Sequence, residues 1–246
     1  MADEKSKILV LVEGKKTDYQ LMERLLQVYG IGDSHEIVSY NTNIYVLYNE
    51  MFRDGDPASL DILQTLKEHE RDPEKKKLFD RWYSDILLIF DLDPQDPAFS
   101  AYKILEMASF FVESSDMGKL YLNYPMVEAF YHMKSIPDED YNGYTASLEE
   151  LRSHKYKERV TRENRNHSYA KFAATKKECS TVIEQNIDKA WIISETERLA
   201  DGISQIVPDP ADILKAQLKN LEEHQLVSVL CTCVFYIADY NPALLQ

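Results

Sequence analysis

Residues 7–30 read KILVLVEGKKTDYQLMERLLQVYG, and this stretch decides the fold class. The run KILVLV is rich in β-branched residues and leucine and has the length of a strand, which predicts a buried strand. After the turn at Glu13 and Gly14, apolar side chains recur at steps of three and four residues, which predicts a helix that Gly30 closes. The chain therefore opens with a strand, a tight turn and a helix.

Three more segments predict strands: HEIVSY at 35–40, SDILLIFDLD at 84–93 and GKLYLN at 118–123. Helical patterns lie between and after them, at 43–52, 58–70, 75–83, about 99–113 and 125–134. Strands of the fully buried type that alternate with helices predict an α/β fold, with a parallel sheet covered by helices on both faces.

From about residue 144 onward we find helical patterns only. The last of them, 211–240, is strongly apolar over 226–237, which predicts a core helix or a helix that joins two copies of the chain in a homo-oligomer. We therefore expect a catalytic α/β domain over 1–143 and a helical C-terminal extension over 144–246. A length of 246 residues with only 7 glycines and 9 prolines excludes collagen, disorder and linker-rich arrays.

The charge of the chain is unevenly distributed. Residues 1–150 hold 15 Lys and Arg against 29 Asp and Glu, whereas residues 151–246 hold 13 of each kind. Within the second part, residues 152–177 carry nine Lys and Arg and two Glu. A basic segment in a chain of net charge -14 favours an anionic partner such as nucleic acid.

No apolar run is long enough for a membrane span, and the start of the chain is too quickly charged for a signal peptide, so we expect a cytoplasmic protein without a membrane partner. The three cysteines are too few and too clustered for a disulfide framework or a zinc site. Cys179, Cys231 and Cys233 are expected to be reduced and buried, the last two in an apolar helix.

Acidic residues follow the predicted strands. Glu13 follows the first strand, Asp91 and Asp93 end the strand at 84–93, and Glu128 comes shortly after Asn123 at the end of the strand at 118–123. Ligands of open parallel sheets collect at these carboxyl ends. Carboxylates that meet there repel one another unless a divalent cation such as Mg²⁺ offsets their charge. The alternative is that Asp91 and Asp93 are loop acids that cap the next helix.

Glu-Gly after one strand and Asp-x-Asp after another resemble the Toprim superfamily, the catalytic domain of topoisomerases, primases and several nucleases. VEGKKTD at 12–18 is similar to the E-G-x-x-T-E opening of its RloB-like and OLD-like branch, with Asp18 in place of the second Glu. FDLD at 90–93 resembles the branch's Asp-x-Asp, and NYPMVEAFYH at 123–132 resembles its N-P-x-x-E-x-W motif, with Tyr124 inserted and Phe130 in place of Trp.

The resemblance implies a Toprim fold and a nuclease that depends on Mg²⁺ or Mn²⁺. It implies Glu13, Asp91 and Asp93 as metal ligands and catalytic residues, Asp18 as a further ligand, and Lys15 and Glu128 as further catalytic residues. Related nucleases act in bacterial antiphage or abortive-infection systems beside an ATPase, so the resemblance implies that role and that partner. It leaves residues 135–246 unassigned.

Other functions compete with a nuclease. A phosphate-binding P-loop is excluded, because Leu9 and Lys16 stand where that motif needs Gly and Ser or Thr. FDLD also resembles the nucleophile strand of haloacid-dehalogenase phosphatases, although Pro94 replaces the Thr of that family. A third hypothesis is an interaction module that has kept the fold and lost the chemistry.

The basic segment is the candidate nucleic-acid interface, for DNA or for RNA such as tRNA. The cations assigned to it are Lys155, Lys157, Arg159, Arg162, Arg165 and Lys171. Tyr156, His167 and Tyr169 lie among them and are candidates for stacking on unpaired bases. The alternative is a solvated helix face. His132, four residues after Glu128 on the helix expected there, is interpreted as an orienting or core histidine.

Overall fold

The computed structural model describes residues 7–53, 55–196 and 206–246, and the chain forms two compact units. The first unit comprises the chain up to Phe90 and residues 102–121. The second comprises residues 91–101 and everything from Leu122 onward. The domain boundary expected at 143/144 stays a prediction.

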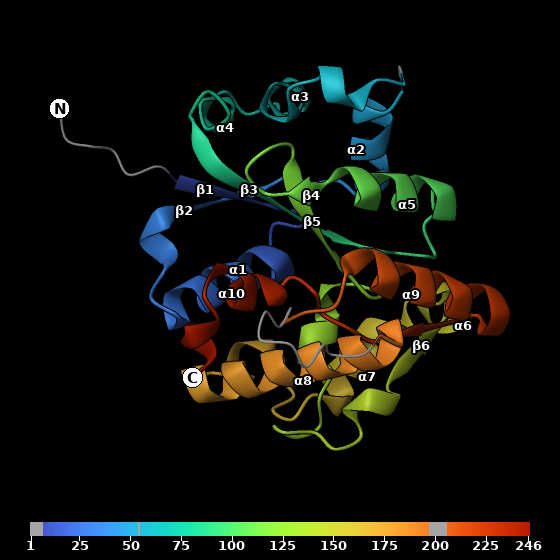
Figure 1. Ribbon diagram of the computed structural model, residues 1–246. Coiled ribbons are helices and arrows are strands. Elements are labelled where there is room, and N and C mark those ends of the chain that lie inside the picture. The colour runs from blue at the N-terminus through green and yellow to red at the C-terminus, as the bar shows by residue number, and fades with distance from the viewer. Residues whose placement is uncertain (1–6, 54, 197–205) are drawn as a thin grey trace. The chain divides into compact units, whose positions relative to one another are not determined.

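A mostly parallel five-stranded sheet is the centre of the fold, which confirms the predicted α/β class (Figure 1). Its strand order is β2-β1-β3-β5-β4. β1 pairs in parallel with β2 and β3, and β4 pairs antiparallel with β5 at one edge. The strands are β1 Lys7–Val12, β2 His35–Ser39, β3 Tyr83–Asp91, β4 Val112–Glu113 and β5 Gly118–Asn123.

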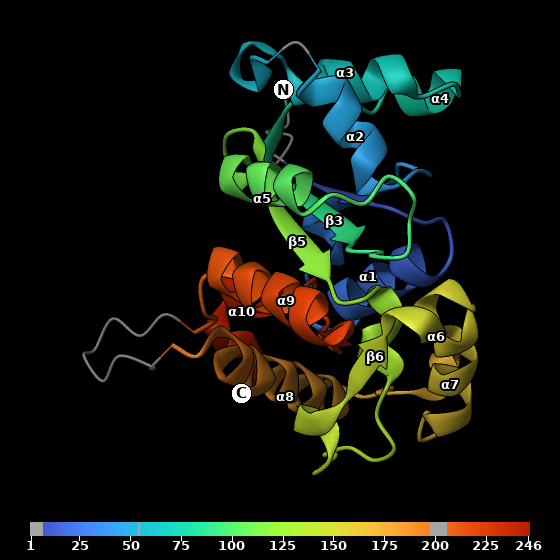
Figure 2. The ribbon, with the colours of Figure 1, turned by 90° about the vertical axis from the view of Figure 1, so that its right-hand side faces the viewer.

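β1 and the second half of β3 are apolar and buried because helices cover both faces of the sheet. In the first unit, α1 lies on one side, and α2, α3, α4 and α5 lie on the other (Figures 1 and 2). Residues 9–12 are therefore completely buried. The helices are α1 Thr17–Val28, α2 Ile44–Met51, α3 Ile62–His69, α4 Pro73–Lys76 and α5 Ala101–Phe110.

The prediction of a helix at 75–83 is wrong. α4 ends at Lys76, and the following residues form turns, with the amides of Leu78 and Phe79 bonded to carbonyls three residues earlier. Tyr83 already belongs to β3, where it lies opposite Lys7. Because that pairing needs an extended chain, the helix has no room to continue.

The prediction of an α-helix at 125–134 is also wrong. The chain there forms a single 3-10 segment, Val127–Tyr131, and every residue in it is buried. The amide of Val127 donates to the Asp91 carboxylate at 2.9 Å. A segment buried on all sides shows no apolar stripe, so its periodicity does not identify the structure.

The second unit is mainly helical, as expected, but it also contains a small antiparallel sheet. Its helices are α6 Leu148–Arg152, α7 Lys155–Glu163, α8 Lys176–Ser194, α9 Pro210–His224 and α10 Phe235–Tyr240. Strands β6, Thr145–Ser147, and β7, Leu226–Ser228, pair with each other. The expectation that the chain after residue 144 forms helices and no strands is therefore wrong.

The apolar run 226–237 is not one helix. Gln225 ends α9 in the left-handed conformation, with φ 58°, and β7 follows directly. Leu230 then forms an antiparallel bridge with Tyr124 before α10 begins at Phe235. The sequence interpretation failed because a continuous apolar run fits a buried strand and a buried helix equally well. The expectation of a continuous helix there is therefore wrong, and a homo-oligomer stays a prediction.

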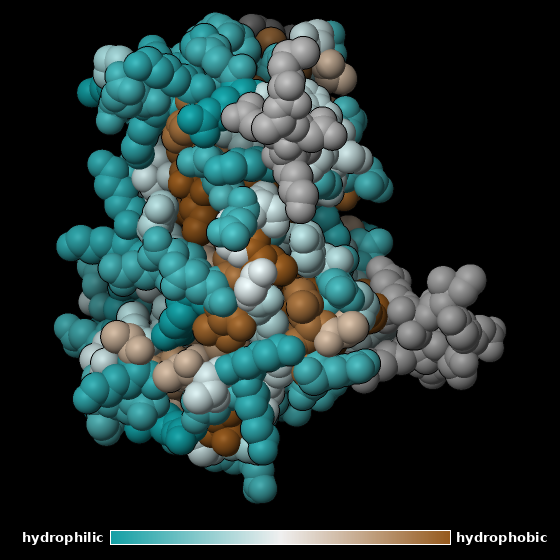
Figure 3. All heavy atoms as spheres, turned by 90° about the vertical axis from the view of Figure 1, so that its left-hand side faces the viewer, coloured by the Kyte–Doolittle hydropathy of each residue, from teal (hydrophilic) through white to brown (hydrophobic). Residues whose placement is uncertain are grey.

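Short 3-10 segments complete the described chain at Gly32–Ser34, Pro57–Ser59, Tyr141–Gly143, Tyr169–Lys171 and Pro242–Leu245. Hydrophilic residues make up most of the face shown in Figure 3, and apolar residues are visible between them. None of the helices that the structure describes combines the length and the apolar content that crossing a lipid bilayer requires.

Candidate metal centre

The strand order makes the carboxyl ends of β1 and β3 the expected place for a ligand. From β1 the chain leads through α1 to β2 on one side, whereas β3 lies on the other side of β1. Neighbouring strands whose connections run in opposite directions define a topological switch point, and open α/β sheets bind ligands there. Glu13 follows β1, and Asp91 is the last residue of β3.

The backbone of Glu13 extends the pairing of β1 on both sides. Its amide donates to the carbonyl of Ile89 in β3 at 3.1 Å. Its carbonyl accepts from the amide of Asn41, just after β2, at 2.9 Å. These two bonds fix the backbone of Glu13 beside β3. The residue that it contacts there, Ile89, lies two positions before Asp91.

Gly14 leaves room for a carboxylate that lies beside it. A Cβ at this position would lie 2.6 Å from Oδ2 of Asp18, in the first turn of α1. Asp18 is itself buried. The Glu-Gly turn thus allows α1 to begin close to the end of β1.

We expect Gly14→Ala to destabilise the fold by about 1–3 kcal/mol, because the added methyl group must displace the buried Asp18 carboxylate. Urea unfolding measures this difference. The matched control is Gly143→Ala, where an added Cβ meets nothing within 4 Å. Equal stability of the two variants would contradict the steric explanation for Gly14.

Asp91 is held by two donors on one oxygen. Its Oδ1 accepts from the side-chain amide of Asn123 at 3.2 Å and from the backbone amide of Val127 at 2.9 Å. The residue is only 7% exposed. Because the donors come from the last residue of β5 and from the segment that follows it, this part of the chain sets the orientation of the Asp91 carboxylate.

Asp93 lies two residues further, in the left-handed conformation with φ 42°. Such a conformation is uncommon for a residue other than glycine and is concentrated at functional sites. Burial raises the pKa of Asp93, and the negative charges of Glu128 and Asp96 act in the same direction. A hydrogen bond from Gln95 at 2.9 Å and the charge of Lys157 oppose this rise without cancelling it.

These acids converge at the ends of the two paired strands. Glu13, Asp91 and Asp93 each offer a carboxylate oxygen, and the three oxygens lie within 4.8 Å of one another. Oxygen ligands of this kind suit Mg²⁺, which binds one or two carboxylates and keeps several waters. The donor set therefore fits a hard divalent cation. Asp18 is not a member of this group, and its role as a ligand stays a prediction.

An ion pair between a buried glutamate and an exposed lysine lies beside Asp93 in the second unit. Glu128 is 3% exposed, and its Oε1 lies 2.9 Å from Nζ of Lys157. Its Oε2 has no hydrogen-bond partner in the described part of the chain. Loss of hydration by itself would lower the pKa of Lys157, but the charges of Glu128, Asp91 and Asp93 outweigh it and raise that pKa. A lysine from the basic segment therefore faces the acids and stays protonated.

No family model, no curated protein and no solved structure matches this chain. The Toprim fold and family that the motifs suggest therefore stay predictions.

The other cations assigned to nucleic acid fall into two groups. Lys155 and Lys171 are exposed. Arg162 and Arg165 form ion pairs with Glu163 and Glu178, in that order, at 3.3 and 2.8 Å.

The contacts of Arg159 indicate a structural role. One of its terminal nitrogens donates to the carbonyl of Thr145 at 2.6 Å, and Nε lies 3.0 Å from a carboxylate oxygen of Glu150. The guanidinium therefore ties α7 to the segment around β6. Its assignment to nucleic acid stays a prediction that this geometry does not favour.

The aromatic residues of the basic segment differ in exposure. Tyr156 is buried, so it presents no face to a base. Tyr169 is half-buried and stacks on Tyr131 at 4.2 Å, and His167 is exposed. Of the three, His167 alone retains an open ring.

His132 is a core residue, as interpreted, although not on an α-helix. It is buried, and its Nε2 lies 3.2 Å from a carboxylate oxygen of Glu163. Burial lowers its pKa to about 4 despite that partner. His132 is therefore neutral near pH 7 and serves packing in the second unit.

Asn123 connects Asp91 to the backbone near the C-terminus. Its Oδ1 accepts from the amide of Cys233 at 3.2 Å, which leaves its amide nitrogen directed at Asp91. Cys231, Cys233 and Cys179 are buried and form no disulfide, as expected, but Cys231 and Cys233 do not lie in a helix, contrary to the prediction. The residues after β7, for which the sequence predicted a helix, thus support a metal-ligand candidate.

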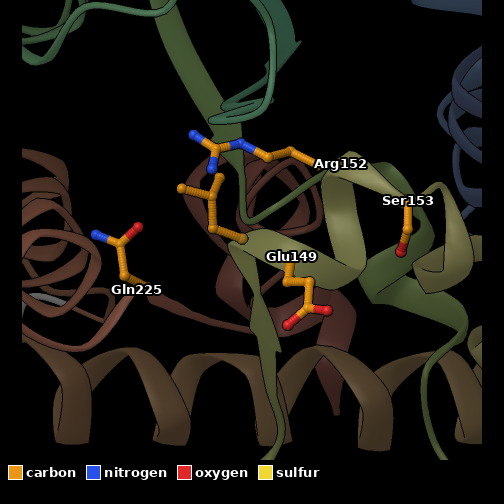
Figure 4. Close-up of a pocket in the computed structure, with 5 residues that line it drawn as sticks. Glu149, Arg152, Ser153 and Gln225 are labelled. Carbon is orange, nitrogen blue, oxygen red and sulfur yellow. The ribbon is translucent and has the colours of Figure 1, made fainter.

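A hollow lies in the second unit, and none of the three acids lines it (Figure 4). Its volume is about 500 Å³, and it is lined by Leu148, Glu149, Arg152, Ser153 and Gln225. The side chains of Arg152 and Gln225 come from opposite sides of it in Figure 4. Its mixed lining contains no cluster of acids or nucleophiles, so it does not resemble a reaction centre.

Sequence reasoning missed two supports of the acids. The amide of Val127 carries no signal in the sequence, because any residue except proline supplies one. Gln95 was readable as a polar neighbour of Asp-x-Asp, but its bond to Asp93 depends on the turn that follows β3.

Proposed function

We propose that this chain hydrolyses nucleic-acid phosphodiesters with a divalent metal ion, Mg²⁺ or Mn²⁺. The observation that carries the proposal is the convergence of Glu13, Asp91 and Asp93 at the topological switch point. Three carboxylates at one place are costly without a cation. A hard cation at such a site is suited to phosphate chemistry.

Each residue has a distinct task in this proposal. Glu13, Asp91 and Asp93 would hold the ion, which polarises a phosphodiester and lowers the pKa of a water. Asn123 and Val127 keep the Asp91 carboxylate in place. Lys157 holds a proton beside the acids and would contact a phosphate oxygen, where its positive charge offsets the charge that develops during hydrolysis.

The resemblance to RloB-like nucleases further supports a role in antiphage defence beside an ATPase. The acidic residues of 1–150 would then form a partner-binding surface that also discourages unspecific contact with nucleic acid. An ATPase that co-purifies with the tagged chain would support this role. Recovery of no ATPase from native cells would argue against it.

The direct test is incubation with single-stranded DNA, plasmid and total tRNA, in Mg²⁺, in Mn²⁺ and in EDTA. We expect cleavage of at least one polymer with a metal ion and none in EDTA. Glu13→Gln should lower the rate by about 100-fold or more, the scale for loss of one group that stabilises a transition state.

Glu23→Gln is the matched control, because Glu23 is an exposed acid on α1. It should cleave like the wild type. Metal-independent cleavage, or equal rates for the two variants, would contradict the proposal. Metal binding without cleavage of any polymer would instead favour a module that has lost the chemistry.

A further inference from the structure

A small pocket lies beside Glu13 in the first unit. It measures about 280 Å³ and is formed by the turn after β1, by α1, by the end of β2 and by the region of α4. The residues that line it are Lys15, Tyr19, Ile37, Val38, Ser39, Lys75 and Leu78. This volume is slightly below the usual range of ligand sites, so the pocket suits one small group better than a whole cofactor.

The lining of the pocket carries positive charge and no acid. Lys15 and Lys75 are its only ionisable residues apart from Tyr19. Lys15 is exposed, and Nζ of Lys75 lies 3.8 Å from a carboxylate oxygen of Glu70, too far for a hydrogen bond. Residues 1–150 hold almost twice as many acids as bases, so a pocket whose lining contains two lysines and no acid indicates an anion site.

Ser39 adds a hydroxyl donor. Its Oγ accepts from Nζ of Lys75 at 3.2 Å, so the hydroxyl hydrogen is directed elsewhere. Ser39 is buried, and its position at the end of β2 is fixed by pairing with Val12. Two ammonium groups and a hydroxyl are the side-chain donors that proteins use for backbone phosphates.

The place of the pocket relates it to the acids. Ser39 pairs with Val12, the residue before Glu13, and Lys15 comes two residues after Glu13. The pocket thus lies, like Glu13, at the carboxyl ends of the strands, beside the neighbouring strand β2. The half-buried ring of Tyr19 provides a flat wall at which a sugar or a base can rest.

We propose that this pocket binds a backbone phosphate of the polynucleotide, next to the phosphate that is hydrolysed. Lys15, Lys75 and Ser39 donate to its oxygens, and the contact positions the strand on the acids. This inference rests on the proposed function, because it takes the polymer from it. It assigns Lys15 to substrate binding beside the cluster and adds Lys75 and Ser39, which the motifs do not mark.

The test measures binding without cleavage, by fluorescence anisotropy of short labelled single strands of DNA and RNA in EDTA and again with Ca²⁺. We expect Lys15→Ala/Lys75→Ala to weaken binding by roughly tenfold at low salt and to reduce the salt slope by about 0.7, the value for one phosphate of a single strand. The control is Lys16→Ala/Lys77→Ala, which removes two exposed lysines next to the tested ones. It should bind like the wild type.

Equal affinities and salt slopes for the two double variants would overturn the proposal, and so would a wild type that binds neither polymer under either condition. Inorganic phosphate is titrated calorimetrically in parallel. Phosphate binding that needs both lysines, with unchanged oligonucleotide affinity, would assign the pocket to a free anion and overturn the proposal. If oligonucleotides bind in a lysine-dependent way but are not cleaved in the presence of metal, the phosphate pocket is supported and the proposed hydrolysis is contradicted.

Discussion

Asp91→Asn should abolish Mg²⁺ binding and lower the rate of cleavage by about 10³-fold. The amide oxygen of the new asparagine can still accept the bonds that Asn123 and Val127 donate to Oδ1. The substitution therefore removes one negative charge from the group with Glu13 and Asp93 and leaves the local packing intact. Loss of a single group that stabilises a transition state costs about 10²–10³-fold, and loss of a metal ligand adds weaker binding of the ion.

Without metal, Asp91→Asn should unfold at a temperature equal to or higher than the wild type, because the substitution relieves repulsion between carboxylates. Saturating Mg²⁺ should raise the melting temperature of the wild type and not that of the variant, since an ion that binds the folded state stabilises it. Calorimetric titration and thermal unfolding measure both effects.

The matched control is Asp96→Asn, which removes an acid from the same loop outside the metal-ligand group. Asp96 accepts from the amide of Ala98 at 2.7 Å, and an asparagine can keep that bond. This variant should bind Mg²⁺ and cleave like the wild type. If Asp91→Asn retained both properties, the group of three acids would not be a metal centre.

Lys189→Met should change how stability depends on pH. Lys189 is 1% exposed on α8, and its ammonium donates to the carbonyls of Tyr141 and Tyr144 at 2.7 and 2.8 Å. Burial lowers its pKa to about 7, although the charge of Asp138 opposes the change. In the unfolded chain the pKa of lysine is about 10.4. Between these two values, the unfolded state binds more protons than the folded state.

Stability therefore rises with pH through this window, by up to about 1.4 kcal/mol per pH unit from this group. The gain is complete above the unfolded pKa and is lost as the pH falls toward 7. A methionine has no proton to release, so the difference in unfolding free energy between wild type and Lys189→Met should grow in favour of the wild type from pH 7 to pH 10. Urea unfolding at several pH values measures it.

Lys177→Met is the control for this experiment, because Lys177 lies on the same helix and is exposed. Its difference from the wild type should stay flat with pH. A flat difference for Lys189→Met as well would mean that Lys189 keeps an ordinary pKa in the fold. At all pH values the methionine variant should be the less stable one, because it leaves two buried carbonyls without their donor.

The central sheet was readable from the sequence because its strands carry a strong local signal. β1 and β3 contain long apolar runs, β2 and β5 contain shorter ones, and each strand lies where the sequence predicted it. The segments at 125–134 and 226–237 were misassigned for the opposite reason. Burial on all sides removes the alternation of polar and apolar residues from which periodicity is read.

By itself, the sequence determined the α/β class and placed Glu13, Asp91 and Asp93 at strand ends, since both follow from local hydrophobic runs. The strand order β2-β1-β3, which brings these acids to a switch point, was decided by the tertiary structure. The tertiary structure also decided two contacts between distant residues. Lys157 contacts Glu128, 29 positions earlier in the chain, and Lys75 contacts Ser39, 36 positions earlier. Contacts of this kind depend on how whole elements pack, and no local pattern of residues encodes that packing.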